Sequence, residues 1–311
     1  MSTEQGRREP AVRRAIFILG VQRRSGTNFL CDLIHLHPQC TRVPDVAEDF
    51  LVANAAHLDA FVSGVAGSWH EKWDPDGSGA SLLRETVGAS VIEFLHAKAA
   101  AARQRVPSYV VTKSPTVEGL EFVGMLPRSS VLVIVRDGRA VVESGVRSFG
   151  WDFERASLRW AAAVDTIVRA RDAGVPFLLL RYEDVLLDLR HELGRAFAYT
   201  GLDAARYDFA AAEGQPVRGS SDLREDASAL HWKPVERWAG FNPLERFASW
   251  TPEQHARFDE LAGEQLAALG YVASSEDDAS SEDDAVHEHE GLGAPVGQER
   301  PVGDLAERRE L

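Results

Sequence analysis

Four short, continuously apolar runs alternate with stretches of helical periodicity, and this alternation constrains the fold more than any other feature. The apolar runs span 15–21, 109–112, 131–135 and 177–180. A strand with apolar residues at every position is buried on both faces, as in a parallel sheet. Helical patterns occur at 27–36, 81–104, 117–126, 138–148, 154–173, 188–199 and 252–269. The sequence therefore predicts an α/β fold, a mostly parallel sheet flanked by helices on both faces.

The composition argues against several other classes of protein. The 311 residues are 44% hydrophobic and 26% charged, which suits one large domain with its own core. No apolar stretch has the length of a membrane span, and no signal-peptide pattern is present. Cys31 and Cys40 form neither a disulfide framework nor a metal motif. Because a basic stripe is also lacking, we expect a cytoplasmic protein without nucleic-acid or membrane partners; the oligomeric state stays open.

The two ends of the chain differ from the middle. Residues 1–14 are polar and are predicted to form a flexible N-terminal arm. Residues 273–311 contain twelve acidic residues against three basic ones, and they repeat Ser-Ser-Glu-Asp-Asp-Ala. Acidic sequence without aromatic residues buries too little surface to offset the entropy of ordering. We therefore predict a disordered acidic tail at 273–311 and a folded domain at 15–272.

The first predicted strand runs into a loop, Gly20-Val-Gln-Arg-Arg-Ser-Gly-Thr-Asn, and a helix starts near Thr27. Such a loop directs backbone N–H groups and the positive end of a helix at one point, which favours binding of an anion. The lysine of a Walker A loop is missing. An ordinary strand–helix turn is the alternative. The candidate phosphate contacts are Arg23, Arg24, Ser25, Gly26, Thr27 and Asn28.

Several segments together resemble one known family. The Arg24-Ser-Gly-Thr segment is similar to the 5′-phosphosulfate loop of sulfotransferases that use 3′-phosphoadenosine-5′-phosphosulfate (PAPS). Residues 131–144 resemble the family's 3′-phosphate motif, in which an arginine ends a strand and a serine follows eight residues later. Residues 112–115, 181–184 and 220–235 resemble the branch of the tyrosylprotein sulfotransferases and their bacterial relatives. The resemblance covers 15–272 and implies the P-loop nucleotide-kinase-like sulfotransferase fold, PAPS as co-substrate, PAP as product and no metal.

The resemblance also implies roles for single residues. Arg24 and Lys113 are implied to be catalytic, with the Lys113 ammonium as a donor to the oxygen that bridges sulfur and the leaving phosphate. A solvated or salt-bridged lysine is the alternative. Arg136 and Ser144 are implied to bind the 3′-phosphate; the alternative for Arg136 is an ion pair with Asp137 or Glu143.

Further residues resemble those that close over the nucleotide, namely Tyr182, Ser220, Ser221 and Lys233. Tyr182 is equally consistent with a core tyrosine. Arg139 lies near the 3′-phosphate motif and is interpreted as surface charge or as an additional contact.

The general base is not given by the main motifs. Cytosolic members of the family carry a histidine two residues after the lysine, where this chain has Pro115. Related branches use a glutamate shortly before aromatic residues, and Glu48 matches best, with Asp45 and Asp49 in reserve. A carboxylate serves as a base if burial lifts its pKa. An exposed cap for a helix near Phe50 is the alternative.

Two other functions compete with this interpretation. The first is a P-loop kinase-like phosphotransferase, which the missing Walker lysine argues against. The second is a non-catalytic nucleotide-binding module, which Lys113 and the nearby carboxylates argue against. We expect the acceptor to be a hydroxyl or amine of a carbohydrate or secondary metabolite, bound mainly by residues 45–105.

Overall fold

A computed structural model of the chain describes residues 12–43, 47–101, 107–215 and 246–271, all within one unit, Met1–Ser274. Five strands form one sheet in the order β2-β3-β1-β4-β5, and every pairing is parallel. The strands are β1 (Arg14–Gly20), β2 (Cys40–Arg42), β3 (Tyr109–Ser114), β4 (Ser129–Val135) and β5 (Leu178–Arg181). The predicted parallel α/β fold is confirmed.

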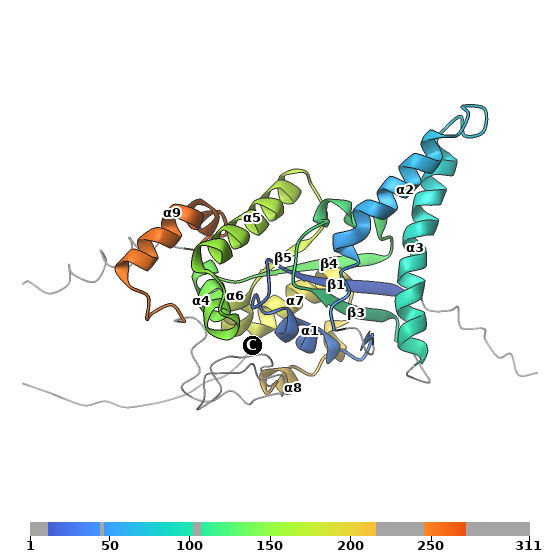
Figure 1. Cartoon of the computed structure of the whole chain (residues 1–311). Coiled ribbons are helices and arrows are strands. Elements are labelled where there is room, and N and C mark those ends of the chain that lie inside the picture. Colours follow the sequence, from blue (N-terminus) through green and yellow to red (C-terminus); the bar gives the residue numbers. More distant parts are fainter. Residues whose placement is uncertain (1–11, 44–46, 102–106, 216–245, 272–311) are drawn as a thin grey trace, which may run out of the picture. The chain divides into compact units, whose positions relative to one another are not determined.

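Helices connect the strands (Figure 1). The α-helices are α1 (Thr27–His35), α2 (Ala55–Gly67), α3 (Ser78–Ala101), α4 (Gly138–Phe149), α5 (Phe153–Asp172), α6 (Tyr182–Leu187), α7 (Leu189–Thr200), α8 (Phe209–Glu213) and α9 (Pro252–Ala268). Short 3-10 turns are η1 (Val52–Asn54), η2 (Leu120–Met125) and η3 (Ala204–Arg206). Among the described residues, no helix combines the length and the apolar character needed to cross a membrane.

Each face of the sheet carries its own apolar core, and β1 contributes to both. Phe17 and Leu19 pack into a cluster with side chains from α3, α4, α5 and α9. Ile16 and Ile18 pack into a second cluster with side chains from α1, α6 and α7. Successive side chains of a strand point to opposite faces, so the buried residues 15–19 of β1 must all be apolar. This explains the continuous apolar run and confirms that helices cover both faces.

The structure differs from the sequence prediction at several elements, among them η2 and α2. The predicted helix at 117–126 is only the 3-10 turn η2, which follows Gly119 in a left-handed conformation (φ 74°). A side-chain carbon on Gly119 would lie 2.1 Å from the carbonyl oxygen of Val52, so this backbone approaches η1 too closely to continue a regular helix. Helix α2 was not predicted, because it buries only Ala55 and Val62 and therefore shows little apolar periodicity.

Gly88 and Gly64 test the packing of α3 on η2. A side-chain carbon on Gly88 of α3 would lie 1.7 Å from the carbonyl oxygen of Met125, whereas the same position on Gly64 of α2 has open space. Alanine favours a helix over glycine by about 0.5–1 kcal/mol. We predict that Gly64→Ala raises the free energy of unfolding, whereas Gly88→Ala lowers it by about 1–3 kcal/mol because α3 must shift. Urea denaturation of both variants measures the difference; equal stabilities would contradict this packing.

Candidate active site

The strand register brings three predicted site segments to one edge of the sheet. Ile18 of β1 pairs with Lys113 of β3, and Gly20, which ends β1, pairs with Ile134 of β4. The glycine-containing loop, Lys113 and Arg136 therefore lie at the carboxyl ends of three adjacent parallel strands. Ligands of open parallel sheets bind at such an edge.

The loop after β1 has a strained and internally bonded backbone. Arg24 has a left-handed conformation (φ 78°), and Gly26 (φ 97°) caps α1. A non-glycine residue holds this conformation only where its surroundings enforce it. A side-chain carbon on Gly26 would lie 2.5 Å from the ring of Tyr182, so the loop rests directly on this buried tyrosine. The hydroxyl of Ser25 donates to the carbonyl oxygen of Gln22 (2.7 Å) and accepts from the Gln22 N–H (3.2 Å). Ser25 thus fixes the loop from within.

Two arginines donate to the hydroxyl of Ser144 on α4, and a third donates to the backbone of the loop. The Arg24 Nε donates to Ser144 Oγ at 2.9 Å, and Arg246 Nη1 donates to the same oxygen at 3.5 Å. Arg136 Nη1 donates to the carbonyl oxygen of Arg24 at 3.4 Å, and its guanidinium lies 4.7 Å from the ring centre of Tyr182. Guanidinium groups from three separate segments thus create a concentrated positive charge beside the loop, which favours an anionic ligand. Sequence analysis did not single out Arg246, because it stands outside every motif.

Asp137 and Glu143, the two carboxylates considered as ion-pair partners of Arg136, bind other residues. Asp137 binds Arg139, with Arg139 Nη2 at 2.8 Å from Asp137 Oδ2. Glu143 accepts a hydrogen bond from Trp250 Nε1 at 2.9 Å. Arg139 is only 5% exposed and its guanidinium lies 4.3 Å from the ring centre of Phe247. The interpretation of Arg139 as surface charge was therefore wrong: its side chain is buried with its own counter-ion.

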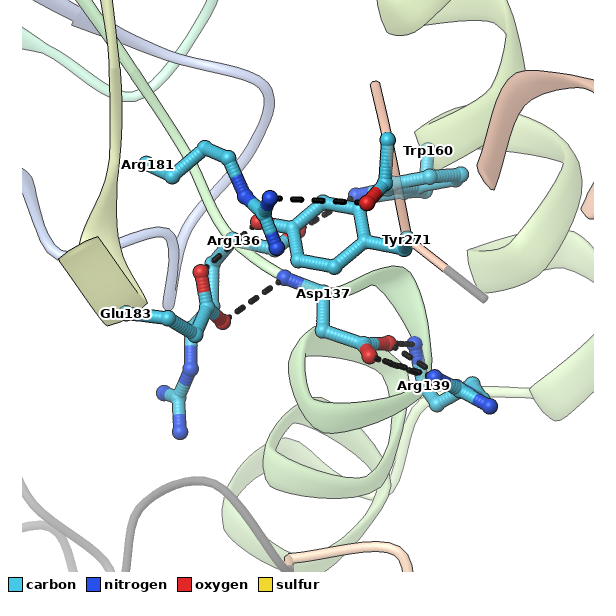
Figure 2. A network of polar contacts seen from close by, with 8 residues as sticks. Arg136, Asp137, Arg139, Trp160, Arg181, Glu183 and Tyr271 are labelled. Carbon is cyan, nitrogen blue, oxygen red and sulfur yellow. Dashed lines mark hydrogen bonds and ion pairs between the residues drawn. The ribbon is translucent and has the colours of Figure 1, made fainter. Parts of the chain in front are cut away.

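A buried network holds the corner between β4 and α4, from which Arg136 projects (Figure 2). Glu183 Oε1 accepts from the Asp137 N–H at 3.0 Å, and Glu183 Oε2 accepts from the Tyr271 hydroxyl at 2.7 Å. Trp160 Nε1 donates to the carbonyl oxygen of Arg136 at 3.2 Å. Burial, with the adjacent negative charge of Glu183, raises the pKa of Tyr271. Sequence analysis missed this pairing because the two partners lie in distant segments.

Lys113 and Glu48 form an ion pair in a small cavity. Lys113 Nζ lies 3.5 Å from Glu48 Oε1, and the side chains are 12% and 27% exposed. Asn28 from the start of α1 lines the same cavity, which has a volume of about 320 Å³. The structure therefore brings together the predicted catalytic lysine, the carboxylate predicted as the base and one residue of the loop.

The neighbouring carboxylate, Asp49, anchors its own segment. Asp49 Oδ2 accepts from the Thr112 hydroxyl at 2.6 Å, and Asp49 Oδ1 accepts from the Leu51 N–H at 2.7 Å. The Phe50 N–H donates to Ser114 Oγ at 2.9 Å. Burial raises the pKa of Asp49. Because both of its oxygens carry these bonds, Asp49 fixes the segment against β3. Glu48 lines the cavity, as does Asp32, which is paired with Arg42.

The remaining predicted residues divide into two groups. Thr27 is buried as the first residue of α1, and Arg23 is exposed. The residues that lie outside the described part of the chain are Asp45, Ser220, Ser221 and Lys233. Within the described part, no group of three or more His, Cys, Asp or Glu side chains is placed to hold a metal ion.

The family of the chain follows from a comparison with known proteins. The sequence profile of the sulfotransferase family matches residues 15–206. Because this match covers more than half of the 311 residues, the chain belongs to the sulfotransferase family. No curated protein sequence is significantly similar to it.

Solved sulfotransferase structures resemble the chain at low sequence identity. The sulfotransferase domain of the Synechococcus olefin synthase is 17% identical, with coverage of 83% of this chain and 96% of that domain and a TM-score of 0.44. The sulfotransferase domain from the curacin biosynthetic pathway is 15% identical, with coverage of 85% and 99% and a TM-score of 0.45. A mouse sulfotransferase in complex with PAP is 15% identical, with coverage of 82% and 85% and a TM-score of 0.41.

Tyr271→Phe tests the network behind Arg136. Removing the hydroxyl takes a hydrogen bond from a buried carboxylate, which should lower the free energy of unfolding by about 1.5–3 kcal/mol. Tyr207→Phe is the matched control, because the Tyr207 hydroxyl donates to a neutral acceptor, the carbonyl oxygen of Leu33, at 2.7 Å. This control should lose about 0.5–1.5 kcal/mol. Urea denaturation of both variants gives the comparison, and a smaller loss for Tyr271→Phe would contradict the network.

Proposed function

We propose that the protein transfers a sulfuryl group from PAPS to a hydroxyl or amine of an acceptor. The observation that carries this proposal is a cluster of three arginines beside the loop at the start of α1. Arg24 and Arg246 donate to the Ser144 hydroxyl, and Arg136 donates to the backbone carbonyl of Arg24. PAPS differs from ordinary adenine nucleotides in its 3′-phosphate. Planar guanidinium groups match the oxygens of a phosphate in two-point contacts, so this cluster fits the group that distinguishes PAPS.

The loop and α1 fit the other end of the same nucleotide. Backbone N–H groups at the N-terminus of α1 and the positive end of its dipole favour a phosphosulfate there. The hydrogen bond between Arg24 and Ser144 joins the loop to the proposed 3′-phosphate site. The two anionic groups of PAPS are thus expected to occupy two sites that share one arginine.

Lys113 and Glu48 supply the groups that the transfer requires. The acceptor oxygen forms a bond to sulfur while the bond between sulfur and the bridging phosphate oxygen breaks. The electron pair of the broken bond stays on that oxygen, which becomes part of the phosphate of PAP. Glu48 takes the proton of the acceptor hydroxyl. Lys113 meets the negative charge that develops on the bridging oxygen. Since arginine and lysine provide the positive charge, we expect the reaction to need no metal ion and to proceed in the presence of EDTA. We expect the protein to act in the cytoplasm.

Differential scanning fluorimetry with PAP, ADP and ATP-Mg tests the nucleotide. We predict that PAP stabilises the protein most, because a ligand that binds only the folded state raises the melting temperature. Arg136→Ala should raise the dissociation constant of PAP by about tenfold or more, since charge-assisted hydrogen bonds are worth about 1.5–3 kcal/mol each. A larger stabilisation by ATP-Mg than by PAP would favour a kinase instead.

Lys113→Ala and Glu48→Gln separate the two catalytic roles. We predict that Lys113→Ala lowers turnover by about 10²–10³ while PAP binds nearly as before, because the charge it meets develops only in the transition state. Glu48→Gln should lower turnover by about 10²–10⁴ with an alcohol acceptor. That loss should shrink with an acidic phenol, which has already lost most of its proton, whereas the Lys113 defect should persist.

Steady-state kinetics with labelled PAPS and both acceptor types measures these effects. Asp49→Asn serves as the comparison, because Asp49 is assigned to holding its segment on β3 rather than to proton transfer. Near wild-type turnover of Glu48→Gln with every acceptor would remove Glu48 from the mechanism.

A further inference from the structure

A second, larger cavity lies beside the loop after β1, with α5 as one of its walls. Its volume is about 590 Å³, within the range of small-molecule sites. The other walls come from the loop itself and from the segment that follows β3. Among the described residues, Lys113 and Glu48 line the smaller cavity instead. A compound in the larger cavity is therefore held apart from the groups assigned to the transfer.

Two arginines from separate elements line the larger cavity. Arg23 comes from the loop, where the sequence predicts it as a phosphate contact, and Arg159 comes from α5. Both side chains are exposed. Within the described part of the chain, neither guanidinium forms a hydrogen bond or an ion pair, whereas the next loop residue, Arg24, donates to Ser144. The N–H donors of both guanidinium groups are thus available to a ligand.

The charge of the cavity favours an anion. Glu118 is the one carboxylate among the described residues of the lining, so two positive charges are opposed by one negative charge. Glu118 is exposed and pairs with neither arginine in the part of the chain that the structure describes. An anion between the two guanidinium groups would screen their mutual repulsion. Planar guanidinium groups bind carboxylate, phosphate or sulfonate oxygens in two-point contacts, so one of these groups fits the cavity.

The remaining lining adds a flat apolar surface. Trp151 packs against Gly145, where a side-chain carbon would lie 1.8 Å from the indole, and its ring stacks on Phe149 with centroids 5.4 Å apart. The indole is therefore held in place, and Phe50 lines the same cavity. Aromatic rings pair favourably in offset or edge-to-face arrangements. The lining as a whole thus suits a ligand that combines an anionic group with an aromatic ring.

We propose that the larger cavity is a binding site for an aromatic organic anion. Arg23 and Arg159 hold the anionic group, and Trp151 and Phe50 contact the ring. This site is separate from the arginine cluster at Ser144 and from the smaller cavity. The inference goes beyond the proposed function and does not depend on it, because Arg159 takes no part in the proposed transfer.

Calorimetry on the PAP-saturated protein tests the site while the nucleotide site is filled. The probes are phenyl phosphate, benzoate and benzenesulfonate, which identify the preferred anionic group and have no transferable sulfuryl group. Inorganic phosphate and benzyl alcohol are the comparison compounds, since each has only one half of phenyl phosphate. We expect phenyl phosphate to bind more tightly than either half. Higher salt should weaken its binding, because the arginines are exposed.

Arg159→Met is the decisive variant, because Arg23 is also a candidate contact of the nucleotide. It should weaken phenyl phosphate by about fivefold or more, through the loss of a two-point ionic contact that solvent partly screens. Arg155→Met is the matched control. Arg155 lies one turn earlier on α5, is equally exposed and does not line the cavity. This control should leave phenyl phosphate binding unchanged, and both variants should keep the melting temperature of the wild-type protein.

Glu118→Gln tests the charge of the cavity in the opposite direction. Removing the one carboxylate of the described lining removes its repulsion of the anion, so phenyl phosphate should bind about twofold more tightly or better. Benzyl alcohol carries no charge and should bind as it does to the wild-type protein. Weaker binding of phenyl phosphate to this variant would contradict an anion site here.

Three further results would overturn the inference. Phenyl phosphate could bind no more tightly than its two halves, Arg159→Met and Arg155→Met could weaken it equally, or saturating PAP could abolish its binding and so place it in the nucleotide site. The proposed function fails separately. If PAP does not stabilise the wild-type protein, the sulfotransferase assignment is wrong, whereas binding of phenyl phosphate that depends on Arg159 and not on Arg155 would still support this site.

Discussion

The parallel pairing of β1 with β3 and β4 is the constraint on which the site depends. Because all three strands run in the same direction, their carboxyl ends meet, and residues almost a hundred positions apart in sequence become neighbours. Lys113 reaches the loop through its pairing with Ile18, and Arg136 follows the strand on the other side of β1. A shift of one residue in either pairing would turn the side chains of that strand to the opposite faces. The two apolar cores oppose such a shift, since each takes alternate residues of β1.

Positive charge collected at one place is unfavourable unless the structure holds it there. Arg24 reaches Ser144 from a left-handed backbone conformation, and Arg136 leaves a corner fixed by Glu183 and Trp160. The electrostatic repulsion between the arginines is offset by buried hydrogen bonds outside the cluster, such as those of Glu183 and Trp160. Because these arginines are already ordered, an anion that binds between them does not lose free energy in ordering their side chains. Preorganisation of this kind increases affinity.

The sequence was sufficient to predict the strands, which have a regular apolar pattern, and the site residues that directly follow a strand. Continuous apolar runs indicated four of the five strands, and the parallel arrangement placed Lys113 and Arg136 at one edge. Pairings across the chain could not be predicted, because nothing in the sequence connects Tyr271 with Glu183, or Arg246 with Ser144. Burial was also misjudged for Arg139, since charged residues are rarely buried and its packing against Phe247 involves a distant segment. Helix α2 escaped detection because it buries so few of its residues.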